Sequence, residues 1–265
     1  MKIEEIEQTT ILRSVVGSTV HGLNVKDGLE DRDEMGICIE PIKYAMGIHA
    51  PFEQFIYRSA AEREGRHDAP SKAGDLDLTI YSLRKWLRLA LKGNPTVILL
   101  LFTPTESIIK WDARGSQLRD LAPLIISREA GSAFLGYMQA QRQRLIGERG
   151  QMRIHRTELV EKHGFDTKYA MHTLRLGFQG VELLETGRLT LPMRSPEREW
   201  LYSVREGKVK LQECLTRAGE LEARLKDLRD SSPLRPTPDI EEVERWMLDT
   251  YEMTWSARRP TLEKK

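Results

Sequence analysis

The sequence predicts an α+β protein in which short strands come first and long helices follow. Over the first 110 of the 265 residues, short runs rich in β-branched side chains alternate with glycine turns, a pattern typical of strands. Later in the chain, apolar residues recur at steps of three and four, which indicates amphipathic helices. We therefore expect a strand-containing domain over residues 1–110 and a mainly helical domain over residues 111–265.

Three strands are predicted in the first part, over residues 11–16, 35–39 and 76–81. In the third, leucine and isoleucine at even positions alternate with other residues, as in a strand with one buried face. The period then changes, and apolar residues over 83–91 line one side of a helix. Lys92-Gly93-Asn94-Pro95 ends that helix, because glycine and proline are typical of helix ends.

The remaining elements of the chain are predicted from the same periods. Residues 96–102 form a short buried helix or strand, whereas the polar stretch 60–72, inside the uninformative segment 40–74, has no period and predicts a mobile loop. Four long helices are predicted in the second part, over 131–149, 167–186, 198–230 and 240–253, with a proline-rich link at 231–238.

Composition excludes several classes of protein. Hydrophobic residues make up 40% and charged residues 31%, as in soluble globular proteins rather than disordered or fibrous ones. The chain has 41 Lys and Arg against 40 Asp and Glu, so its net charge of +1 argues against a strongly basic nucleic-acid-binding coat. The net charge does not exclude a local basic cleft. The longest apolar run, 97–102, is too short to cross a membrane, so no membrane partner is expected.

The sequence also predicts a cytoplasmic protein. Residues 1–5 are acidic and lack the apolar segment of a secretory signal. The two cysteines, Cys38 and Cys214, have no metal-binding spacing and are too few for a disulfide framework. A reducing compartment is therefore the expectation.

A glycine-serine turn and a pair of aspartates carry the strongest functional signal. Gly17-Ser18 follows the first strand, where glycine allows close approach to a ligand and the N–H groups of a turn can bind phosphate oxygens. Asp31 and Asp33 stand at the start of the next strand and point to one side of it, so Arg32 should point to the other. The two carboxylates repel each other, and a divalent cation such as Mg²⁺ relieves that repulsion.

A third carboxylate on a neighbouring strand would complete a site for two metal ions. Asp75-Leu76-Asp77-Leu78 supplies two candidates. Asp77 is preferred, because its apolar neighbours would anchor the strand while its carboxylate faces the cleft. Asp75 is the second choice.

Two further features leave alternatives open. The predicted helix 167–186 carries a polar stripe that either faces a cleft and binds phosphate or is an ordinary solvated face. His21, in the glycine-serine turn, either contacts a phosphate or base or simply fills the turn. The stripe comprises Lys168, His172, Arg175, Gln179 and Glu182, and Asp166 or Thr167 would cap its helix.

These motifs together resemble those of the nucleotidyltransferase superfamily that includes DNA polymerase beta. The shared pattern is Gly-Ser, a spacer, Asp-x-Asp and a distal Asp flanked by apolar residues. Within the superfamily, the chain is similar to a bacterial and phage branch of predicted nucleotidyltransferases associated with RNA repair. Residues 77–86, 92–95 and 164–176 carry this closer resemblance, the last with the spacing Lys-x-x-x-His-x-x-Arg, and it covers about residues 9–210.

The resemblance implies a fold, a reaction and site residues. The fold is a small mixed β-sheet domain backed by helices, followed by a mainly α-helical domain that closes the cleft. The reaction is transfer of an NMP from an NTP, such as ATP, to a hydroxyl acceptor, with release of pyrophosphate. Asp31, Asp33 and Asp77 would be catalytic and hold two Mg²⁺ ions, and Gly17, Ser18, Lys168, His172 and Arg175 would bind the nucleotide.

The sequence does not identify the acceptor, and two other functions are alternatives to nucleotidyl transfer. An RNA end, a small molecule and a protein hydroxyl are all candidate acceptors, and the near-neutral charge disfavours a long nucleic-acid tract. The first alternative function is a catalytically silent nucleotide-binding or regulatory module on the same fold, which the presence of all three carboxylates argues against. The second is a helical scaffold whose acidic pair is only a solvated turn.

Overall fold

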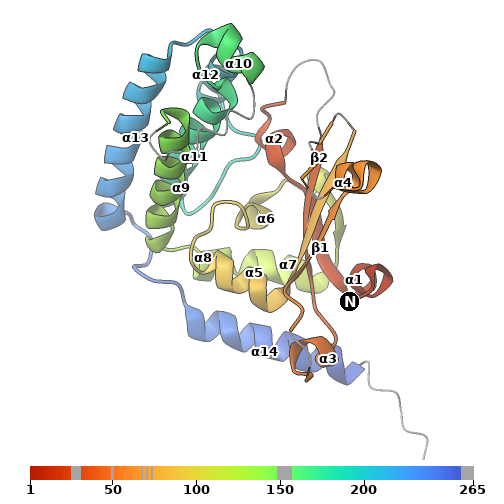
Figure 1. Ribbon diagram of the computed structural model, residues 1–265. Coiled ribbons are helices and arrows are strands. Elements are labelled where there is room, and N and C mark those ends of the chain that lie inside the picture. The colour runs from red at the N-terminus through yellow and green to blue at the C-terminus, as the bar shows by residue number, and fades with distance from the viewer. Residues whose placement is uncertain are drawn as a thin grey trace, which may run out of the picture.

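A mixed sheet of five strands, in the order β3-β4-β2-β1-β5, forms one side of the molecule (Figure 1). The structure is a computed structural model that describes residues 1–24, 31–48, 51–66, 68–69, 71–72, 74–147 and 157–257. β2 runs parallel to β4, and the other neighbouring strands are antiparallel. The strands are β1 (Thr10–Val15), β2 (Arg32–Cys38), β3 (Gln54–Arg58), β4 (Leu76–Ser82) and β5 (Ile108–Trp111).

Helices precede, interrupt and follow the sheet. Those of the first part are α1 (Ile3–Thr9), α2 (Gly17–His21), α3 (Ile42–Ala45), α4 (Ser59–Glu64), α5 (Leu83–Ala90), α6 (Leu99–Phe102) and the 3-10 turn η1 (Thr105–Ser107). The later ones are α7 (Ala113–Asp120), α8 (Ala122–Ile125), α9 (Glu129–Leu145), α10 (Thr157–His163), α11 (Thr167–Thr186), α12 (Glu197–Arg205), α13 (Leu211–Ser231) and α14 (Ile240–Ala257). In the part of the chain that the structure describes, every helix is too short or too polar to span a lipid bilayer.

The two faces of the sheet contact different hydrophobic cores. Met35 of β2 points into the main core, which the helices of both parts of the chain complete. Ile80 of β4 points the other way and packs with Ile6 of α1 in a smaller core. Because successive side chains of a strand alternate between faces, Asp33 and Asp77 lie on the face of the main core.

Helix α11 is the centre of the helical part and packs against α9, α12 and α13 (Figure 1). Its start is capped as predicted, since the Asp166 carboxylate accepts hydrogen bonds from the backbone N–H groups of Lys168 (2.9 Å) and Tyr169 (3.0 Å). Gly187, at φ 73°, ends it. The cap thereby fixes the first turn of α11, which carries Lys168.

Most predicted elements are confirmed. The three strands correspond to β1, β2 and β4, and the helix after the third strand is α5. The segment 96–102 forms turns followed by a short helix, α6 (Leu99–Phe102), rather than a strand, and α11 covers the predicted range 167–186. The predicted helix 131–149 is α9, which ends at Leu145; residues 148–150 lie outside the described residues.

Two predicted elements are wrong. The helix predicted over 198–230 is two helices, α12 and α13, because Gly207 between them has a φ of 73° that a helix does not allow. The loop predicted over 60–72 begins as a helix, α4, which buries Ala60 and ends at Gly65. The preceding strand β3 was not predicted, and neither were β5, α1 and α3, all short.

The last helix, α14, packs back against the first part of the chain. The Tyr251 hydroxyl donates a hydrogen bond to Glu40 Oε1 (3.0 Å), and Trp255 Nε1 donates to the Glu40 backbone oxygen (2.9 Å). Burial raises the pKa of the Glu40 carboxyl, whose residue is only 2% exposed. Glu40 lies just beyond β2, so α14 covers the end of the central strand that is opposite to its aspartates.

Candidate active site

Three aspartates converge at the N-terminal ends of β2 and β4. Asp33 and Asp77 are direct neighbours in the parallel ladder, and Asp31 comes one residue before β2. One carboxylate oxygen of each lies within 4.8 Å of the others, and all three residues are half-buried. They line one cavity of about 360 Å³. The predicted convergence is confirmed, and it concentrates negative charge that a cation would neutralise.

Asp75 is held elsewhere, so Asp77 is the member of this group. The Asp75 carboxylate accepts hydrogen bonds from Ser59 Oγ (2.9 Å) and from the Lys72 backbone N–H (2.7 Å), and it pairs with Arg63. The hydrogen bond from Arg63 is the largest cause that holds the pKa of Asp75 far below its usual range. Asp75 is therefore committed to the segment that follows β3.

Arg32 points away from the aspartates, as predicted. Its Nε lies 2.6 Å from Glu34 Oε1, and the Arg13 guanidinium from β1 lies 2.5 Å from Glu34 Oε2. Glu34 and Arg32 occupy the face of β2 opposite to Asp33, because they alternate with it along the strand. The arginine between the two carboxylates therefore leaves them accessible to the cavity.

Both the backbone conformation and the neighbouring Asp33 side chain require a glycine at position 17. Its φ is 70°, in the left-handed region, and a Cβ at this position would lie 2.1 Å from Asp33 Oδ2. The preceding residue is tied to the same strand, since the Val16 N–H donates to the Asp33 backbone oxygen (2.9 Å). Instead of an open turn, Gly17 and Ser18 begin the short helix α2, and both line the cavity with Asp33.

The basic residues of α11 line the same cavity from the opposite side. Lys168, His172 and Arg175 come to it from the first turns of the helix. Over this part the polar stripe therefore faces the cavity, and phosphate binding by it stays a prediction. Gln179 continues it but is 1% exposed, and Glu182 accepts a hydrogen bond from the Thr190 backbone N–H (3.0 Å). The structure thus brings all eight predicted site residues to one cavity.

His21 joins the glycine-serine segment to α11. Arg175 Nη1 donates to His21 Nε2 (2.6 Å) and to Gln179 Oε1 (2.9 Å), and the Gln179 amide nitrogen lies 3.0 Å from His21 Nδ1. His21 is 3% exposed, and desolvation, with Arg175 and His172 nearby, lowers its pKa well below the usual value. Neutral His21 therefore positions Arg175, and the sequence alone could not choose between this role and a phosphate contact.

Arg175 has a positive charge without a carboxylate partner among the described residues. Its Nε is buried and has no hydrogen-bond acceptor. Desolvation lowers the pKa of the guanidinium to about 10, so it stays protonated at neutral pH. A half-buried cation that is paired only with neutral groups favours an anion in the adjoining cavity.

The buried neutral state of His21 predicts a pH dependence of stability. Because its pKa is lower in the folded than in the unfolded chain, the unfolded chain binds the proton first as the pH falls below 6.5. Protonation of His21 in the unfolded chain then lowers the free energy of unfolding by up to about 1.4 kcal/mol for each pH unit. Urea unfolding between pH 7.5 and 5.5 should show a shallower decline for His21→Gln than for the wild type. Equal slopes would contradict the neutral assignment.

The rest of the cavity was not predicted. Its wall continues from Asp77 along the same face of β4 through Thr79 and Tyr81, and their alternation with Asp77 was the available signal. Residues from other elements had no signal in the sequence, since only the fold brings them here. The apolar part of the wall is formed by Val16, Leu23, Met35, Tyr81, Pro95, Leu99, Met171 and Leu176.

Comparison with known proteins assigns the chain to a family. No curated protein is significantly similar to the chain. A crystal structure of a nucleotidyltransferase-like protein from Exiguobacterium sibiricum 255-15 is 12% identical, with a match that covers 92% of this chain and 74% of that one and a TM-score of 0.30. The family model described as RlaP, RNA repair pathway DNA polymerase beta family, matches residues 1–249. The chain therefore belongs to the RlaP family, an RNA repair pathway family of the DNA polymerase beta type.

Proposed function

We propose that the protein is a Mg²⁺-dependent nucleotidyltransferase that transfers an NMP from an NTP to a hydroxyl group and releases pyrophosphate. The observation that carries the proposal is the arrangement of one cavity, with Asp31, Asp33 and Asp77 on the sheet side and Lys168 and Arg175 among the basic residues opposite. Carboxylates on one side and cations on the other suit a metal-bound triphosphate. Membership of the family supports the same reaction.

The donor set fits a hard divalent cation. The three groups that converge are carboxylates, which Mg²⁺ prefers over nitrogen and sulfur ligands. Both cysteines are buried outside the cavity. When bound, Mg²⁺ would neutralise phosphate charge and lower the pKa of the attacking hydroxyl. Asp31, Asp33 and Asp77 are the residues that would hold it.

The residues of the chain then have separate tasks. Gly17 and Ser18 hold phosphate oxygens beside Asp33, and Asp77 orients the acceptor hydroxyl. Lys168, His172 and Arg175 bind the triphosphate and stabilise the negative charge that develops on pyrophosphate as it leaves. His21 keeps Arg175 in place without adding a second positive charge, because it is neutral. The aspartates on one side of the cavity thereby suit the metal cations, and the basic residues on the other side suit the negatively charged triphosphate.

An RNA end is the acceptor that we propose. The family is described as part of an RNA repair pathway, and the net charge of +1 fits a contact with a terminus better than with a long tract. Tyr81 belongs to the apolar wall of the cavity, against which a base of the RNA end would pack. A small molecule or a protein hydroxyl would be found by the same assay with other acceptors.

The test combines binding with turnover. Mg²⁺ and a non-hydrolysable NTP analogue should raise the melting temperature, because a ligand that binds only the native state stabilises it. Each labelled NTP is then incubated with Mg²⁺ and RNA oligonucleotides, small hydroxyl compounds or protein acceptors, and pyrophosphate release is measured. Asp33→Asn should abolish the release. Asp68→Asn, an exposed aspartate outside the cavity, is the matched control and should leave it unchanged.

Other outcomes of this test select the alternatives. Tight NTP binding without turnover on any acceptor would favour a nucleotide-binding module without transfer activity. Absence of any Mg²⁺-dependent stabilisation would instead favour a scaffold whose aspartates have no ligand. Release that persists in Asp33→Asn would contradict the assignment of the site.

A further inference from the structure

We infer that Arg58 and Ser71 are positioning residues that orient the Asp77 carboxylate for the cation. The inference rests on the proposed function, since it assumes that Asp77 is a metal ligand. Arg58 ends β3, and Ser71 lies in the segment between α4 and β4. Neither residue was singled out in the sequence, and neither lines the cavity.

The sheet places Arg58, Asp77 and Asp33 in one row. Arg58 of β3 is the direct partner of Asp77 in the antiparallel ladder, and Asp77 is the direct partner of Asp33 in the parallel one. In the strand order β3-β4-β2, Arg58 and Asp33 therefore lie on opposite sides of Asp77. Arg58 therefore approaches Asp77 from the β3 side, whereas Asp33 lies on the β2 side.

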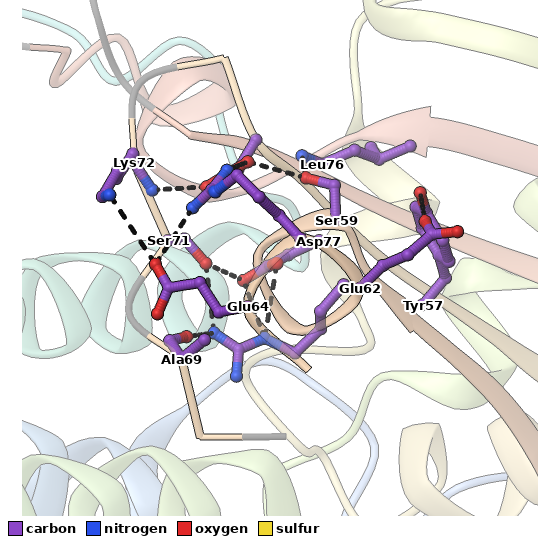
Figure 2. A network of polar contacts seen from close by, with 12 residues as sticks. Tyr57, Ser59, Glu62, Glu64, Ala69, Ser71, Lys72, Leu76 and Asp77 are labelled. Atoms are coloured by element: carbon purple, nitrogen blue, oxygen red, sulfur yellow. Dashed lines mark hydrogen bonds and ion pairs between the residues drawn. The ribbon is translucent and has the colours of Figure 1, made fainter. Parts of the chain in front are cut away.

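Both oxygens of the Asp77 carboxylate have a partner in this network (Figure 2). Arg58 Nε lies 3.3 Å from Oδ1 and 3.4 Å from Oδ2, and Ser71 Oγ donates to Oδ2 at 2.9 Å. Arg58 Nη2 in turn donates to Ser71 Oγ (3.1 Å) and to the Ala69 backbone oxygen (3.1 Å). The guanidinium thus fixes the hydroxyl that also holds the carboxylate.

In this geometry, Arg58 and Ser71 orient the Asp77 carboxylate rather than compete with a cation for it. A carboxylate has about four lone-pair positions, so the two donors, Arg58 Nε and Ser71 Oγ, do not use the whole accepting capacity of Asp77. One Asp77 oxygen still lies within 4.8 Å of oxygens of Asp33 and Asp31. Asp77 is 24% exposed and Arg58 31%, so the pair is only partly desolvated and its charge attraction is moderate. Groups that hold a metal-binding carboxylate fix its orientation, and their loss typically lowers metal affinity or activity by about 10–100-fold.

The test measures cation binding without nucleotide or turnover. Mn²⁺ alone is titrated into the full chain, and the electron paramagnetic resonance signal of free Mn²⁺ reports the dissociation constant. Arg58→Ala should weaken Mn²⁺ binding by about 10–100-fold, and Ser71→Ala should weaken it in the same direction. Arg58→Lys keeps the charge but not the planar fork and should restore only part of the affinity.

Arg63→Ala is the matched control. It removes an arginine of the same segment that pairs with Asp75 instead of Asp77, and it should leave Mn²⁺ affinity unchanged. Asp33→Asn separates the two proposals: if it binds Mn²⁺ like the wild type, the cation site and with it the proposed function fail. If Asp33→Asn loses binding while Arg58→Ala and Ser71→Ala bind like the wild type or more tightly, the positioning role is overturned. Should Arg58→Ala not fold, Ser71→Ala and Arg58→Lys decide.

Discussion

Replacement of Asp77 by asparagine is expected to lower pyrophosphate release by about 10²–10³-fold, in line with the loss of one preorganised charge-stabilising group in other active sites. The amide keeps the shape of the side chain but removes the negative charge beside Asp33 and Asp31. Because Asp77 is half-buried and contacts Arg58 and Ser71 at the sheet edge, the fold should tolerate the change. Initial rates of pyrophosphate release at saturating NTP measure the effect.

Asp75→Asn is the matched comparison, and it should affect stability rather than turnover. Asp75 has stronger polar contacts than Asp77, to Arg63, Ser59 Oγ and the Lys72 N–H, but none of them belongs to the aspartate group. Its loss should lower the melting temperature and retain most of the turnover. A variant pair in which Asp75→Asn is inactive and Asp77→Asn is active would contradict the assignment of the third carboxylate.

Gly17→Ala should be the most damaging small substitution near the site. Alanine at φ 70° costs about 1–2 kcal/mol of backbone strain, and its Cβ would also occupy the position of Asp33 Oδ2. We expect a melting temperature lower by several degrees, since 1 kcal/mol corresponds to about 2–4 °C for a chain of this size. We also expect loss of Mg²⁺-dependent NTP binding, because Asp33 must move. Thermal melting with and without Mg²⁺ and the NTP analogue measures both effects.

Gly65→Ala separates strain from displacement. Gly65 has a similar φ of 66°, but nothing lies within 4 Å of the position that its Cβ would take. It should therefore show the loss of stability without the loss of ligand binding. If both variants bind the nucleotide equally well, the contact between residue 17 and Asp33 has no role in the site.

The local parts of the site could be predicted from the sequence, because each depends on spacing within one element. Asp31 and Asp33 are two residues apart at the start of β2, and Lys168, His172 and Arg175 share one side of a helix. Which aspartate near residue 76 joins them depends on the parallel register of β2 and β4, which only the folded sheet sets. The sequence could rank Asp77 above Asp75 but could not exclude Asp75.

The parts that could not be predicted depend on contacts distant in sequence. Strand β3 is five residues long at the edge of the sheet, and its sequence, QFIYR, does not alternate between apolar and polar residues. Its last residue, Arg58, therefore had no visible connection with Asp77. His21 is similar, since its partners Arg175 and Gln179 lie more than 150 residues later in the chain. The division near residue 110 into two domains stays a prediction.

The contact between α14 and Glu40 has a consequence for synthesis of the protein. Glu40 leaves the ribosome early, whereas Tyr251 and Trp255, which bind it, leave it more than 200 residues later. Until then, a carboxyl group destined for burial has no partner from the C-terminal helix. The region around β2 therefore reaches its final packing only after translation of residue 255, and nascent chains halted earlier are expected to be substrates for chaperones or proteases.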